Sequence, residues 1–222
     1  MKTLSEVEKT RLLILARDLM NHHFADALFC TRDKWGIPQK HINDWIISHF
    51  GYMAARRIHV DYGATRVVVV ADNLDWVLKF DFQNAGLSHE YNELEVKNYQ
   101  YACEWNLEDC FAAMYFLEKV NSIKVYAQER VRIDDDLTSD SFYEYTLQNY
   151  YSDEDSDDED VRENAWEDSN ELDNEDRIYA MVDNLTAREL VRFTNRYDIN
   201  DLHSGNWGYR DGDPVLVDYA GY

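Results

Sequence analysis

Two apolar runs decide the fold of this chain, Arg66-Val67-Val68-Val69-Val70 and Trp76-Val77-Leu78-Lys79-Phe80. Valine and aromatic residues at this density are typical of β-strands, and the polar residues between the two runs favour a turn. A further run begins at Arg57 and continues into Tyr62-Gly63-Ala64-Thr65. The sequence therefore predicts three consecutive strands between Arg57 and Phe80.

Lys79 lies in the middle of the third predicted strand. Val77, Leu78 and Phe80 flank it, so its side chain belongs to a strand that is otherwise apolar. A lysine is rarely buried unless another charge compensates it. We therefore expect a charged partner for Lys79 and an anionic ligand close to it.

The next segment predicts a helix from Ser88 to Tyr101. Ser88 is a suitable N-cap, acidic residues follow in the first turn, and neither Gly nor Pro interrupts the segment. Glu93 and Glu95 of this helix are both candidates for the partner of Lys79. Both glutamates also fit the solvated face of a helix, where most glutamates are found.

Two more strands are predicted after this helix. They cover Phe111 to Leu117 and Ile123 to Val131, and Asn121-Ser122 forms the turn between them. A plain antiparallel hairpin explains this alternation equally well. The order of the segments along the chain therefore carries more information than either strand.

A polar motif near the C-terminus contains residue types suited to magnesium and phosphate chemistry. Asp201-Leu202-His203-Ser204-Gly205-Asn206 precedes the predicted strand Pro214-Val215-Leu216-Val217, and Asp218-Tyr219-Ala220-Gly221 follows that strand. Carboxylate and amide oxygens are preferred ligands of Mg²⁺, and a carboxylate can orient an attacking hydroxyl. The alternative is a polar turn followed by a Gly-Asp-Pro hairpin.

Taken in order, these segments resemble the protein kinase-like superfamily from about Ile58 to Tyr222. The Asp-x-His-x-x-Asn form is similar to that of aminoglycoside phosphotransferases and of phage-encoded Ser/Thr kinases. The resemblance implies an α+β, kinase-like fold. We expect a five-stranded antiparallel N-lobe, an N-terminal helical extension and a reduced helical C-lobe.

The resemblance also implies ATP and Mg²⁺ as cofactors, and it gives roles to individual residues. Asp201 would orient the acceptor hydroxyl, and Lys79 would hold the phosphates. Glu95 best fits the family position of the residue that fixes Lys79, and Glu93 is the second candidate. Asn206 and Asp218 would bind Mg²⁺.

Further contacts follow from the same resemblance. Gly63 and Thr65 would contact phosphate, although the kinase loop usually has several glycines and this one has a single Gly. The hinge that reads adenine through its backbone would lie from Glu129 to Val131.

The motif departs from the family near the catalytic Asp201. Ile199 stands where kinases usually have His, and Asn200 stands where Arg or Gly is common. Four residues follow Asp218, so we expect a minimal, C-terminally truncated member without an activation segment.

The resemblance divides the chain into four parts. Residues 1–57 form the helical extension, 58–133 the N-lobe, 134–177 an acidic and flexible insertion, and 178–222 the reduced C-lobe.

Helices are predicted on both sides of the kinase-like segments. A capping box at Ser5-Glu6-Val7-Glu8 opens a helix that runs to about Asn21, and a second helix covers Gln39 to Phe50. These N-terminal helices either pack on the back of the sheet or form a partner-binding module. Apolar residues from Ile178 to Phe193 predict one broken helix or two short ones.

The net charge is −22, and much of it comes from one window. Ser152 to Arg177 contains fourteen acidic and two basic residues, which contributes −12. We expect the run from Ser152 to Asp160 to form an extended, solvated loop. Such a run could be a solvated spacer, a nucleic-acid mimic that binds a basic partner, or a modification site at Ser152 and Ser156. The overall charge disfavours direct nucleic-acid binding.

Composition narrows the class of protein. A chain of 222 residues with 45 % hydrophobic and 14 % aromatic residues can form a substantial core. The three cysteines have no C-x-x-C spacing, which disfavours structural zinc and a disulfide scaffold. We find neither a signal peptide nor an apolar run near 18 residues, so we expect a cytoplasmic protein without a membrane partner.

The sequence thus predicts an ATP-dependent kinase-like protein. It would phosphorylate a Ser or Thr hydroxyl of a protein, or of its own chain, as a phage protein acting on host factors. The alternative is a pseudokinase that acts as an acidic inhibitor or interaction protein against a host nucleic-acid-binding protein. Small-molecule phosphotransfer would require a substrate lobe that the sequence does not reveal.

Overall fold

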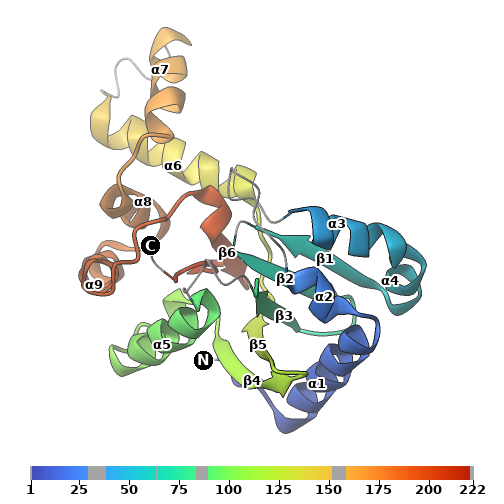
Figure 1. Ribbon diagram of the computed structural model, residues 1–222. Helices are drawn as coiled ribbons and strands as arrows, with labels where there is room; N and C mark the ends of the chain where they lie inside the picture. The colour runs from blue at the N-terminus through green and yellow to red at the C-terminus, as the bar shows by residue number, and fades with distance from the viewer. Residues whose placement is uncertain (1, 30–38, 64, 84–89, 152–158, 221–222) are drawn as a thin grey trace. The chain divides into compact units, whose positions relative to one another are not determined.

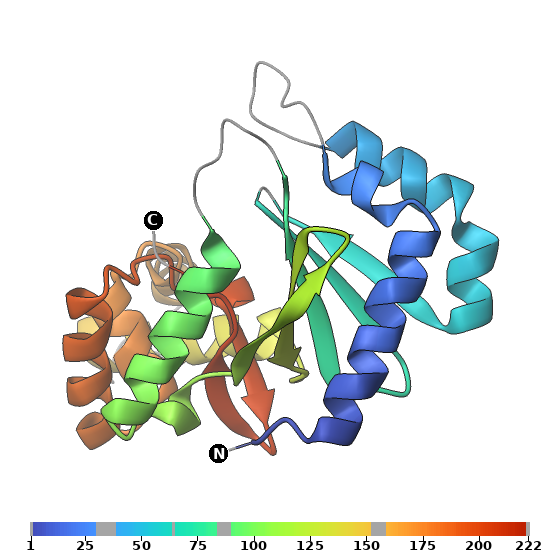
Figure 2. The same ribbon diagram turned by 60° about the horizontal axis from the view of Figure 1, so that its bottom comes forward.

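The computed structural model describes residues 2–29, 39–63, 65–83, 90–151 and 159–220. The chain forms two compact units, shown in Figures 1 and 2. The first unit contains residues 1–99 and 113–130, and the second contains residues 100–112 and 131–222. Each unit has its own core.

A five-stranded antiparallel sheet forms the centre of the first unit, which confirms an α+β protein. Its strands are β1 (Ile58–Tyr62), β2 (Arg66–Ala71), β3 (Trp76–Asp81), β4 (Met114–Val120) and β5 (Ile123–Glu129), in the order β1-β2-β3-β5-β4. Asn121 and Ser122 join β4 to β5 with φ values of 50° and 68°, the left-handed backbone of a tight hairpin turn. β4 begins three residues later than the predicted fourth strand. The other predicted strands match within two residues.

In the described residues that precede the sheet, the first unit has four helices. They are α1 (Glu6–Asn21), α2 (Phe24–Leu28), α3 (Gln39–Ser48) and α4 (Phe50–Arg56). The predicted capping box is present, because Ser5 accepts from the Glu8 N–H and the Glu8 carboxylate accepts from Ser5. Phe24 packs edge-on against Phe80 of β3 with ring centroids 5.2 Å apart. The N-terminal helices therefore pack on the sheet, as one of the two predicted alternatives requires.

The two faces of this sheet differ in chemistry because side chains alternate along each strand. The apolar face lies toward the N-terminal helices, and it contains Val67, Val69, Leu78, Phe80 and Ala127, all buried. The polar face contains Arg66, Lys79, Asp81, Tyr126 and Gln128. Helix α5 (Tyr91–Glu104), whose residues up to Tyr99 belong to the first unit, covers the polar face (Figure 2). This helix was predicted, and its predicted N-cap Ser88 lies outside the described residues.

The second unit is mainly helical. Its elements are η1 (Glu108–Cys110), α6 (Asp135–Tyr150), α7 (Glu159–Ser169), α8 (Asn174–Met181), α9 (Asn184–Arg196), η2 (Ser204–Asn206), β6 (Trp207–Arg210) and β7 (Asp213–Leu216). Helices α8 and α9 confirm the prediction of two short helices before the polar motif. The ring of Phe111 contacts the rings of both Phe193 and Tyr219 in the core of this unit.

Most of the segment predicted as a flexible acidic insertion is helical, and these helices were not predicted. Asp134 caps α6 by accepting from the Leu137 N–H, and acidic residues in the first turn favour the helix N-terminus. Phe142 of α6 and Ala165 of α7 are buried. The acidic composition of residues 134–177 outweighed these apolar positions in the sequence prediction. Residues 152–158 of the predicted loop lie outside the described residues.

The hairpin of β6 and β7 contains a glycine with a packing role. A Cβ atom added at Gly208 would lie 2.5 Å from Val131 Cγ2 and 3.1 Å from Ile133 Cδ1. Carbon atoms do not pack that closely, so only glycine lets β6 lie beside the segment from Val131 to Ile133.

None of the helices in the described parts of the chain combines the length and the apolar character that a membrane crossing requires.

Candidate functional site

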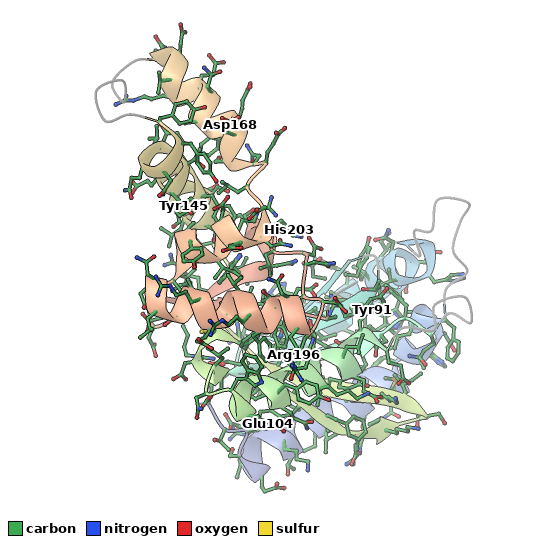
Figure 3. The ribbon with its side chains drawn as sticks, turned by 90° about the vertical axis from the view of Figure 1, so that its left-hand side faces the viewer. Tyr91, Glu104, Tyr145, Asp168, Arg196 and His203 are labelled. Atoms are coloured by element: carbon green, nitrogen blue, oxygen red, sulfur yellow. The ribbon has the colours of Figure 1, made fainter. Side chains whose placement is uncertain are left out.

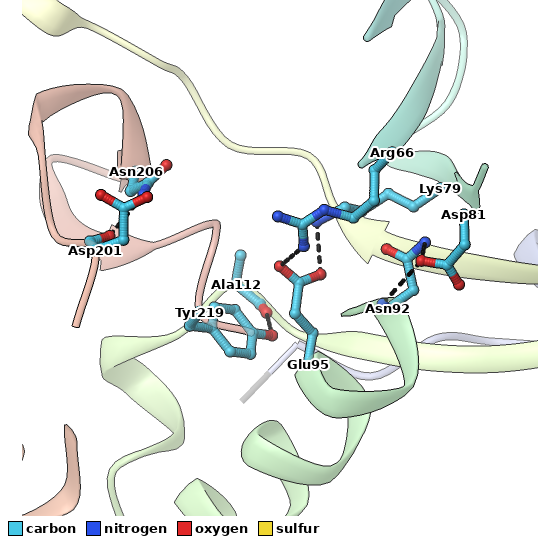
Figure 4. Close-up of polar contacts among 9 residues, drawn as sticks. All are labelled: Arg66, Lys79, Asp81, Asn92, Glu95, Ala112, Asp201, Asn206 and Tyr219. Carbon is cyan, nitrogen blue, oxygen red and sulfur yellow. Dashed lines mark hydrogen bonds and ion pairs between the residues drawn. The ribbon is translucent and has the colours of Figure 1, made fainter. Parts of the chain in front are cut away.

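Lys79 of β3 forms a buried ion pair with Glu95 of α5 (Figure 4). The Nζ to Oε2 distance is 2.6 Å, and the two side chains are 5 % and 0 % exposed. The predicted partner Glu95 is therefore the one that the structure brings to Lys79. Glu93, the second candidate, instead binds Lys124 of β5 at the surface.

Arg66 shares the same carboxylate, and it was not predicted as a site residue. Its Nη1 lies 2.6 Å from Glu95 Oε1, and its side chain is 7 % exposed. Lys79 and Arg66 thus each hold one oxygen of Glu95. The register explains the arrangement, because Arg66 is opposite Asp81 and Val68 is opposite Lys79. An opposite-charge pair at matching positions of adjacent strands is the signal that could have identified Arg66.

Asp81 links the end of β3 to the start of α5. Its Oδ1 accepts from the Asn92 backbone N–H at 3.2 Å and from Asn92 Nδ2 at 2.9 Å. Burial raises the pKa of the Asp81 carboxyl, while the hydrogen bonds from Asn92 and the charge of Arg66 oppose that shift. At neutral pH, protonation of the Asp81 carboxyl therefore costs less free energy than protonation of an exposed aspartate.

Two buried polar atoms at the polar face have no hydrogen-bond partner among the described residues. They are Asn92 Oδ1 and Tyr126 Oη. Burial raises the pKa of the Tyr126 hydroxyl, so this group stays protonated and can donate. Buried polar atoms are nearly always satisfied in native proteins, by protein, water or ligand. The polar face therefore has capacity for further polar contacts.

The hairpin between β1 and β2 contains the predicted phosphate contacts Gly63 and Thr65. The Gly63 N–H donates to the Arg66 carbonyl at 3.0 Å, so this amide already has a partner. The Thr65 carbonyl accepts from the Phe82 N–H. A Cβ atom at Gly63 would meet open space. The hairpin thus gives no sign that Gly63 must be glycine.

The predicted adenine-reading segment, Glu129 to Val131, follows β5. The Glu129 N–H donates to the Ala113 carbonyl, and the Glu129 carboxylate accepts from the Ala113 N–H. Among the described residues, the Val131 backbone N–H and C=O have no hydrogen-bond partner. Val131 therefore offers one donor and one acceptor from its main chain.

In the second unit, hydrogen bonds connect the polar motif to β7. Asn206 Nδ2 donates to the Asp201 carbonyl at 2.6 Å (Figure 4), and the Val217 N–H donates to the Asn206 carbonyl at 2.9 Å. Asp218 is the next residue after Val217. The structure therefore brings Asp201, Asn206 and the start of Asp218 into one local arrangement. Because its amide nitrogen is engaged, Asn206 presents Oδ1 as an acceptor.

His203 belongs to the backbone structure of this loop. Its Nδ1 accepts from the Gly205 N–H at 3.1 Å. Its Nε2 lies 3.8 Å from Asp201 Oδ1. The Asp201 side chain is 39 % exposed, so its carboxylate can reach a solvent-borne group.

Helix α8 supports the loop through Asn174, which sequence reasoning missed. Asn174 Nδ2 donates to the Asn200 carbonyl at 2.7 Å. Arg177 donates to the Asn170 carbonyl, and its buried Nε has no hydrogen-bond partner among the described residues. Burial lowers the pKa of Arg177, and the charge of Asp201 opposes that shift. Arg177 therefore lies within Coulombic reach of Asp201, and no motif spacing signals either residue of α8.

A pocket of about 310 Å³ lies elsewhere in the second unit. Four carboxylates line it, from Asp168, Glu171, Asp173 and Asp176, together with Thr146, Tyr150 and Leu172. Figure 3 shows Tyr145 on α6 and Asp168 on α7, near this region. Tyr145 and Tyr150 both donate to Asp176. An acidic lining repels phosphate, so this pocket is a poor site for a nucleotide.

Within the described parts of the chain, no group of three or more His, Cys, Asp or Glu side chains is placed to hold a metal ion. Asn206 and Asp218 would therefore need oxygens from a bound ligand to complete a Mg²⁺ site. No protein-family model matches this chain, and no curated protein matches it in sequence.

Proposed function

We propose that this protein binds ATP with Mg²⁺ and transfers the terminal phosphoryl group to a hydroxyl of a protein or of its own chain. One observation carries the proposal: Lys79, in an apolar strand of an antiparallel sheet, forms a 2.6 Å buried ion pair with Glu95 of the following helix. The resemblance to kinases predicts this pair at these two positions. A buried, oriented ammonium is suited to hold phosphate.

The residues of the second unit supply oxygen ligands and a carboxylate. Asn206 Oδ1 and the Asp218 carboxylate would hold Mg²⁺, since hard cations prefer oxygen ligands. The half-exposed Asp201 carboxylate orients the acceptor hydroxyl and takes up its proton. Bound ATP would supply the phosphoryl group, and Mg²⁺ would supply the positive charge that neutralises the phosphates.

The adenine would be read by the backbone of the segment after β5. The Val131 N–H and C=O can each form one hydrogen bond with the edge of a base. A phosphate contact from Gly63 is not needed in this proposal, because the Gly63 amide is already engaged.

A second candidate function is an acidic interaction protein that binds a nucleic-acid-binding partner without phosphotransfer. The exposed carboxylates of α7 favour it, namely Glu159, Asp160, Glu163, Glu167 and Asp168. Binding by such a surface should weaken steeply as salt concentration rises. Nucleotide binding should instead depend on Mg²⁺.

Thermal unfolding with and without Mg²⁺-ATP tests nucleotide binding. A ligand at about one hundred times its Kd stabilises by about 2.7 kcal/mol. We expect Lys79→Met and Asp218→Ala to lose this stabilisation. Lys119→Met and Asp213→Ala, at exposed positions, are matched controls that should keep it.

Transfer is measured separately, as label incorporated from γ-labelled ATP into the chain or into added protein. We expect Asp201→Asn to retain the thermal shift and to lose the label. A native chain with no Mg²⁺-dependent shift would overturn the proposal. A shift without any label would favour the non-transferring interaction protein.

A further inference from the structure

One carboxylate serves two buried cations in the first unit. Glu95 Oε1 pairs with Arg66 and Glu95 Oε2 pairs with Lys79, both at 2.6 Å. All three side chains are nearly inaccessible to water. In an isolated Lys–Glu pair, each group is the only counterion of the other.

The sharing of Glu95 by two cations becomes important when an anionic ligand binds to Lys79. A buried carboxylate that loses its counterion carries a large desolvation penalty. If Lys79 were the only counterion of Glu95, turning its ammonium toward a phosphate would expose Glu95 to that penalty. Arg66 removes this conflict, since its guanidinium stays on the other oxygen of Glu95.

The geometry keeps Arg66 in this role. Its strand position is fixed by the register with Asp81, and its guanidinium lies over the Tyr91 ring at 5.7 Å. A guanidinium in such a setting is rigid and always charged, whereas the ammonium of Lys79 is a compact donor on a flexible stem. The two cations are therefore suited to different tasks.

We infer that Arg66 is a positioning residue for a polyphosphate ligand: it is the standing counterion of Glu95, and it frees Lys79 to donate to the phosphates. The inference rests on the proposed function, because it takes the ligand of Lys79 to be the phosphate chain of a nucleotide.

The test compares three probes on the full chain by titration calorimetry: Mg²⁺-ATP, inorganic tripolyphosphate with Mg²⁺, and adenosine. For Arg66→Met we expect Mg²⁺-ATP and tripolyphosphate to bind about tenfold more weakly or worse, the scale of one charge-assisted hydrogen bond. Adenosine, which has no phosphate, should bind as it does to the native chain. Arg66→Lys should restore most of the loss. Arg188→Met, at an exposed position of α9, is the matched control.

The outcomes separate this inference from the proposed function. Unchanged Mg²⁺-ATP binding by Arg66→Met, or an equal loss of adenosine binding, would overturn the positioning role and leave the proposed function intact. Native chain that binds tripolyphosphate but not ATP or adenosine would overturn the nucleotide function, and an Arg66→Met loss there would still support the role of Arg66. Native chain that binds none of the three probes would overturn both.

Discussion

The two faces of the five-stranded sheet have opposite chemistry although they share the same strands. The apolar face packs Phe80 against Phe24 of the N-terminal helices. On the polar face, Lys79, the residue before Phe80, pairs with Glu95 of α5. One face is held by packing that needs no ligand, whereas the other holds buried charges whose balance a ligand can change. Substitutions on the two faces should therefore differ in kind.

The largest expected effect is on the apolar face. Phe80→Ala should lower the free energy of unfolding by about 3–5 kcal/mol, because it removes a fully buried ring and leaves a cavity. Urea unfolding measures this change. Phe50→Ala, where the ring is 70 % exposed, should change stability by about 0.5 kcal/mol or less. Similar losses of unfolding free energy in both variants would contradict the assignment of Phe80 to the core and of Phe50 to the surface.

The next effect is on the polar face. Glu95→Ala leaves two buried cations without their shared carboxylate and should cost about 3 kcal/mol. We place the loss at the lower end of the usual range because Asp81 also lies within Coulombic reach of Arg66. Glu104→Ala, an exposed position on the same helix, is the control for chemical denaturation. A cost no larger than that of the control would show that Glu95 does not neutralise the pair.

A smaller stability effect should come from Lys79→Met. Arg66 still pairs with Glu95 in this variant, so the free energy of unfolding should change by about 1 kcal/mol or less. The same variant should lose its response to Mg²⁺-ATP. Denaturation without ligand checks the first part. A loss as large as that of Glu95→Ala would mean that Arg66 cannot serve as the remaining counterion.

The smallest effect concerns the rim of the polar face, where Glu93 binds Lys124. Hydrogen bonds from Lys124 and other neighbours lower the pKa of Glu93 to about 2. Because the folded pKa lies below the ordinary glutamate value of 4.5, this stabilisation is present above about pH 4.5 and is lost as the pH falls toward 2. The pair is exposed, so it contributes about 0.2–1 kcal/mol.

Glu93→Gln should remove this acid-dependent part of the stability. Unfolding free energies measured between pH 2 and pH 6 should therefore be flatter for the variant by about the contribution of one exposed pair. A pH profile identical to that of the native chain would show that Glu93 has the same pKa in the folded and unfolded states.

Local patterns were sufficient to predict much of the first unit. Runs of valine and aromatic residues located the strands. The apolar run around Lys79 predicted a charged partner, and the resemblance to kinases indicated Glu95 as that partner. Arg66 was missed because its burial depends on the register of β2 against β3, which no single segment contains. Helices α6 and α7 were missed because net charge outweighed apolar positions such as Phe142 and Ala165.

The second unit shows the same limit for the polar motif. The five-residue offset of Asp201 and Asn206 was visible in the sequence, and the structure joins them by a hydrogen bond. The hydrogen bond from Asn174 and the nearby charge of Arg177 come from a helix more than twenty residues away, and tertiary packing alone places them there.

Gly63 and Gly208 should differ in how many substitutions they tolerate, both in a saturation library and among diverging descendants of this gene. At Gly63, where a Cβ meets open space, many side chains should survive selection. At Gly208, where a Cβ would lie 2.5 Å from Val131 Cγ2, glycine should persist almost alone. The invariant glycine of such a lineage would then be Gly208, which packs against the segment that carries Val131. A search for related sequences that relied on a glycine-rich loop at Gly63 would miss this position.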